Sequence, residues 1–75
     1  MEPRVKVLIE VEHERDRQIA KGYAPRHDDE HTPGEFAGFI VQRTHDVEDD
    51  HEPRTAFIQI AALAVAAVES MDRRS

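Results

Sequence analysis

The stretch PRTAFIQIAALAVAAVESMD, residues 53–72, decides the fold. Pro53 suits the first position of a helix, because no intrahelical partner exists there for the N–H that proline lacks. The apolar side chains that follow recur at helical spacing. They form one stripe: Phe57, Ile60, Ala61, Ala64, Val68 and Met71. Leu63 and Ala67 widen this stripe, so the pattern predicts a helix over 53–72 that is buried on more than one side.

A second helix is predicted upstream by the motif Thr32-Pro33-Gly34-Glu35. In a capping box the threonine hydroxyl accepts the N–H of the glutamate, and the glutamate carboxylate accepts the N–H of the threonine. Pro33 again takes the first helical position. The predicted helix covers about 33–43. The side chains expected on one side of it are Phe36, Phe39, Ile40 and Arg43.

The first segment, about 3–21, is also predicted to be a helix, with Pro3 at its start and Gly22 just past its end. One face carries Val5, Leu8, Ile9 and Ile19. Because apolar residues also alternate over 5–11, a short strand stays an alternative there. The length of the segment and its charged continuation over 12–17 favour the helix.

These elements predict a single all-α domain over residues 1–75, a three-helix unit with polar loops at 22–32 and 44–52. A chain of 75 residues has a marginal core, and folds of this size usually add disulfides, a metal or a partner subunit. Cysteine is absent, which excludes disulfides. A metal or self-association is left as the remedy. Because the chain has few large apolar residues, we expect spare apolar surface on its last helix, and we predict a homo-oligomer, a dimer or higher, packed through that helix. A monomeric three-helix unit of low stability is the alternative.

The charge balance excludes several classes of partner. Sixteen acidic residues against ten Lys and Arg give a formal net charge of -6, which argues against generic nucleic-acid binding. The N-terminus lacks the features of a signal peptide, and the longest apolar run, residues 60–68, is shorter than the ~20 residues that cross a bilayer. We expect a protein of the cytoplasm that does not act in a membrane.

Two polar clusters are candidates for ligand binding. In the first, Glu14 and Gln18 share a helix face, Arg15 lies beside it, and Arg17 is expected to point elsewhere. Arginine at this site would bind a phosphate or carboxylate through both arms of its guanidinium group, or would form salt bridges on a solvated helix surface.

The second cluster runs from His27 through Asp28 and Asp29 to His31. Its carboxylates suit Mg²⁺ or Mn²⁺ and its imidazoles suit transition metals. The alternative is structural, with Asp29 or His31 bracing the turn into the next helix. Near the C-terminus, Glu69 and Asp72 are three residues apart and form half of a carboxylate metal site.

The order of the motifs resembles a family of short tailed-phage and prophage proteins. The shared elements are ER-x-RQ at 14–18, a Gly-aromatic pair at 22–23, HDD-x-H at 27–31, Gly-Glu at 34–35 and a terminal AAL…E-x-x-DR helix, which together span about 12–74. Phe36 stands where the family pattern has Leu. This resemblance implies a phage-encoded accessory protein of the bacterial cytoplasm. Family members are compared with all-helical MazG-like nucleotide pyrophosphohydrolases, which hold Mg²⁺ with acidic pairs on facing helices. The present sequence has Glu69-x-x-Asp72 but lacks a matching Glu-x-x-Glu pair.

The leading hypothesis is therefore a non-catalytic binder of an anionic small molecule, a nucleotide or nucleotide-derived signal, that sequesters a host defence signal. Its arginines would pair with phosphate and Tyr23 would stack on a base. The predicted binding residues are Arg15, Arg17, Gln18, Tyr23, His27, Asp28, Asp29, His31 and Glu35.

Two other functions stay open. A Mg²⁺-dependent nucleotide pyrophosphohydrolase, or one using another divalent cation, would require its carboxylates to converge. Its metal candidates are Glu14, Asp28, Asp29, Glu35, Glu69 and Asp72. An inhibitor of a basic host protein would use the acidic loop at 44–52. That loop carries Asp46, Glu48, Asp49, Asp50 and Glu52.

Overall fold

The computed structural model describes residues 2–21, 30–49 and 52–74, and every regular element within those ranges is an α-helix. Helix α1 spans Pro3–Ala20, α3 spans Pro33–Asp49 and α4 spans Pro53–Arg74. The all-α prediction is confirmed. The alternative of a strand over 5–11 is wrong, because these residues lie inside α1.

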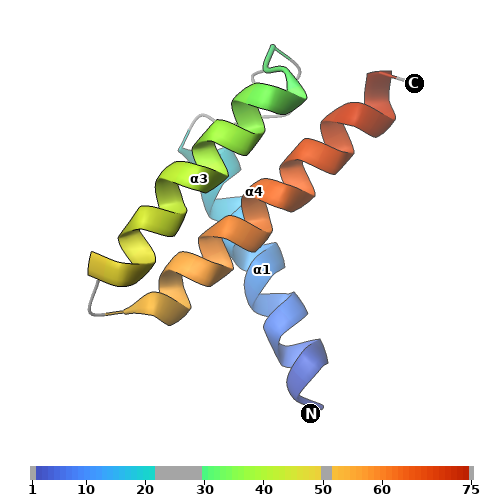
Figure 1. The fold of residues 1–75 in the computed structure, drawn as a ribbon. Coiled ribbons are helices and arrows are strands. Elements are labelled where there is room, and N and C mark those ends of the chain that lie inside the picture. The colour runs from blue at the N-terminus through green and yellow to red at the C-terminus, as the bar shows by residue number, and fades with distance from the viewer. Residues whose placement is uncertain (1, 22–29, 50–51, 75) are drawn as a thin grey trace.

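Helix α4 is the central element (Figure 1). It contacts both of the other helices: α3 runs antiparallel beside it, and α1 crosses it. The N-terminal part of α1 extends past α4, away from α3. One end of α1 is therefore packed against α4, while the other projects from the molecule.

The helix starts follow from local chemistry. The carboxylate of Glu2 accepts a hydrogen bond from the N–H of Arg4 at 3.1 Å, and Pro3 opens α1. At α3, the Thr32 hydroxyl accepts from the N–H of Glu35 at 3.2 Å, and a Glu35 oxygen accepts from the N–H of Thr32 at 3.2 Å. The predicted capping box is thus confirmed.

The end of α3 lies six residues beyond its predicted position. The helix runs through Asp49, so residues 44–49, predicted as loop, are helical. Adding one residue to an existing helix costs little free energy. No Gly or Pro occurs between residue 44 and Pro53, and Pro53 disfavours helical backbone at the residue before it. Val47 is half-buried and gives the extension an apolar contact.

This extension changes the setting of the acidic segment predicted to meet a host protein. Asp50 and the side chains of Asp46, Glu48 and Asp49 lie outside the described residues. Glu52 accepts a hydrogen bond from the Thr55 hydroxyl at 3.1 Å, at the start of α4. Binding of a host protein by these acids stays a prediction.

The core of the described residues is thin. Its buried apolar side chains are Val11, Phe36, Ala56, Ala62 and Ala66. Three of the five are alanines, and with buried Ser70 they form the stripe of α4 that faces its neighbours. Small side chains on this stripe let the helix backbones approach closely.

The predicted buried stripe of α4 is wrong in part, because Ile60, Ala61, Leu63 and Ala67 are only half-buried and other members are exposed. Phe57, Val68 and Met71 are 59%, 52% and 43% exposed. The prediction followed apolar size, whereas the fully buried positions of α4 carry small residues, and its large apolar residues are half-buried or exposed. The expected surplus of apolar surface on the last helix is present.

The apolar face of α1 is not the face that this helix buries. Its apolar side chains are 36% to 59% exposed: Val5, Leu8, Ile9 and Ile19. The face that meets α4 instead carries Val11, Arg15 and Gln18, which are spaced by four and three residues and are all buried.

By length and composition alone, Pro53–Arg73 is long and apolar enough to cross a membrane, with a mean hydropathy of 1.4 over an 18-residue window. The length of the apolar run at residues 60–68 had predicted that no segment is long enough to cross a membrane. Of that window 22% is buried inside the molecule, and the central helix of a water-soluble bundle meets the same criterion.

Candidate functional site

A groove of about 340 Å³ lies where α1 crosses α4. It is lined by Leu8, Val11, Glu12, Arg15, Asp16, Ile19, Val65 and Glu69. Its walls combine branched apolar side chains with three carboxylates and one guanidinium group. The groove thus has an apolar floor and an acidic border.

One predicted binding residue, Arg15, lies in this groove and is held by α4. Its Nε donates to Oε1 of Glu69 at 3.4 Å, and its side chain is only 7% exposed. The other oxygen of Glu69 lies 4.0 Å from Nη1 of Arg73. Glu69 therefore connects α1 to the end of α4, and an anion entering the groove would have to displace this carboxylate from Arg15.

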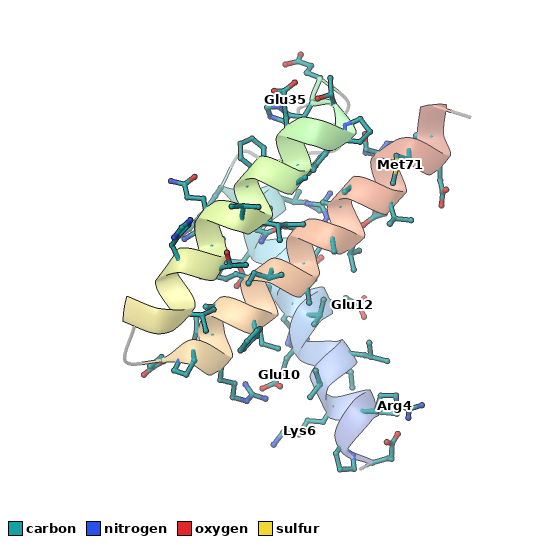
Figure 2. The ribbon with its side chains drawn as sticks, viewed as in Figure 1. Arg4, Lys6, Glu10, Glu12, Glu35 and Met71 are labelled. Atoms are coloured by element: carbon teal, nitrogen blue, oxygen red, sulfur yellow. The ribbon has the colours of Figure 1, made fainter. Side chains whose placement is uncertain are left out.

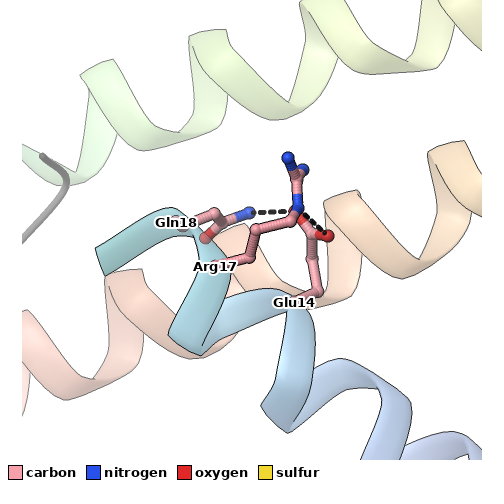
Figure 3. A network of polar contacts seen from close by, with 3 residues as sticks. All are labelled: Glu14, Arg17 and Gln18. Atoms are coloured by element: carbon pink, nitrogen blue, oxygen red, sulfur yellow. Dashed lines mark hydrogen bonds and ion pairs between the residues drawn. The ribbon is translucent and has the colours of Figure 1, made fainter. Parts of the chain in front are cut away.

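The other predicted arginine, Arg17, also binds a carboxylate of the chain (Figure 3). Arg17 donates to the two oxygens of Glu14, from Nε at 2.8 Å and from Nη2 at 2.6 Å, and Gln18 donates to Glu14 at 3.4 Å. The expectation that Arg17 points away from Glu14 is wrong, because residues three apart meet on a helix. The hydrogen bonds from Arg17 lower the pKa of Glu14, against the opposing effect of desolvation. A carboxylate of the chain thus occupies the guanidinium fork that was predicted to bind phosphate.

His31 and Glu35 brace the start of α3. Nδ1 of His31 lies 3.1 Å from Oε2 of Glu35, and the imidazole makes edge contacts with Phe36 and Phe39 at centroid distances of 5.9 and 5.1 Å. The hydrogen bond from His31, followed by that from the Thr32 backbone, lowers the pKa of Glu35. This arrangement favours the structural alternative for His31.

Among the residues that the structure describes, no three His or carboxylate side chains are grouped closely enough to hold a metal ion. Of the metal candidates, Glu14 binds Arg17, Glu35 caps α3 and Glu69 binds Arg15. Asp72 borders an exposed surface of α4. The remaining predicted site residues lie outside the described ranges: Tyr23, His27, Asp28 and Asp29. Metal-dependent hydrolysis and nucleotide binding stay predictions.

Sequence reasoning missed one contact that positions α1. Arg54, at the start of α4, donates to Glu10 and forms an ion pair with it. The hydrogen bond lowers the pKa of Glu10 and raises that of Arg54. No local pattern could have indicated this pair, because it depends on how α1 crosses α4.

Sequence reasoning expected spare apolar surface on α4 but missed that exposed apolar side chains of α1 lie beside it at the groove. Leu8 and Ile19 on α1, and Val65 and Val68 on α4, are between 36% and 59% exposed. They form an apolar face across two helices. We define the face between α1 and α4 by these four residues.

Comparison with known proteins adds no relative: no protein-family model, curated protein or solved structure matches the chain.

Proposed function

We propose that this protein is a self-associating helical subunit in which a second copy covers the face between α1 and α4. The observation that carries the proposal is that large apolar side chains are exposed while small ones are buried. Large apolar side chains are exposed on α1 and α4, while the core of the described residues is built mostly from alanine. Burial of apolar area is the main favourable term in both folding and association.

The solvent-accessible surface area of the chain supports an interface of standard size with a partner. The chain exposes 5431 Å², whereas a compact monomer of 8.6 kDa exposes about 4,700 Å². The surplus of about 700 Å² is close to the ~800 Å² that each partner buries in a standard complex. The radius of gyration of 12.7 Å likewise exceeds the value of about 11 Å for a compact chain of this length.

A second copy fits the composition of this face better than an anionic ligand does. Both described arginines of the predicted anion site hold carboxylates of the same chain. The groove adds Glu12 and Asp16, so its border repels a phosphate. Covering the apolar floor with any apolar surface is, in contrast, favourable, because it removes apolar area from water.

The test is sedimentation equilibrium of the full chain over a wide range of concentrations. We expect the mass to rise to twice the 8.6 kDa of one chain. Val68→Gln should weaken the dimer roughly tenfold, since a polar group enters an apolar contact.

The matched control is Val41→Gln on α3, because Val41 is 56% exposed and Val68 52%. This control should leave the dissociation constant unchanged. A chain that stays monomeric at millimolar concentration would contradict the proposal, as would equal effects of the two valine variants.

A further inference from the structure

We draw no further inference here: the strongest candidate, the exposed apolar face between α1 and α4 beside Glu12 (Figure 2), carries nothing beyond the proposed self-association, because nothing in the described part of the chain shows what covers it.

Discussion

The two halves of α1 follow opposite rules of burial. The half that crosses α4 is polar in sequence, yet Arg15 and Gln18 on it are buried. The projecting half is apolar, yet Leu8 on it is 59% exposed. In a self-sufficient fold the apolar half would be the covered one. The crossing half is fixed within the chain by polar contacts. The exposed apolar side chains of the projecting half are those that the proposed self-association would cover.

The largest expected effect tests the buried side of this contrast. Phe36→Ala should lower the free energy of unfolding by about 3 kcal/mol, because a large buried ring is lost beside Phe39 and His31. Phe57→Ala removes the same ring where it is exposed and should cost less than 1 kcal/mol. Denaturant unfolding of both variants, at a concentration where the chain is monomeric, checks this. Equal losses would mean that burial within one chain does not set stability.

The next effect concerns the alanine stripe. Ala62 is completely buried, so Ala62→Leu should overpack the contact and cost about 2 kcal/mol. Ala64→Leu makes the same change on the exposed side of α4 and should leave the stability of the monomer unchanged. Thermal unfolding followed by circular dichroism measures both. Tolerance of leucine at 62 would show that the helices do not approach through this stripe.

A smaller effect is expected at the polar contact of the crossing half. Arg15→Met keeps an unbranched stem but removes the guanidinium group and its hydrogen bond to Glu69, and should cost about 1 kcal/mol. Glu69→Gln should cost less, since this side chain is 46% exposed and water screens the charge. A double-mutant cycle on these two positions gives their coupling energy. A coupling of zero would remove Arg15 as a link between the helices.

The sequence predicts the starts of the helices but not the faces that they bury. The helix starts were predictable because Pro3, Pro33, Pro53 and the capping box act locally. The buried faces were not, because the described helices pack largely through alanines and through polar side chains such as Arg15 and Gln18. Packing through alanines reverses which side of α4 is inside.

The candidate site was predictable only in its residue types. The spacing of Glu14 and Gln18 correctly placed them on one face, and Gln18 bonds Glu14. Glu69, which accepts a hydrogen bond from Arg15, lies 54 residues away, so this contact depends on the crossing of α1 and α4. A local pattern carries no information on that crossing, and the arginines that were expected to hold a phosphate hold carboxylates instead.

The smallest expected effect is that of pH. Hydrogen bonds lower the pKa of Glu10, Glu14 and Glu35 in the folded chain, so their contribution to stability is present above the ordinary carboxyl pKa of about 4.3. It is lost as the pH falls through the lowered values. The melting temperature should therefore drop between pH 5 and about pH 3, and Glu35→Gln should show a smaller drop. A variant that loses as much as the wild type would contradict the role of Glu35 in capping α3.

The most direct measurement of self-association is an isotope-filtered NMR experiment on an equal mixture of ¹³C-labelled and unlabelled chains. It detects proton contacts only between different molecules. The account predicts intermolecular contacts between the methyl groups of Leu8 and Val68, and none that involve Val41. A mixture without any intermolecular contact at millimolar concentration, with the relaxation rates of a single chain, would contradict it.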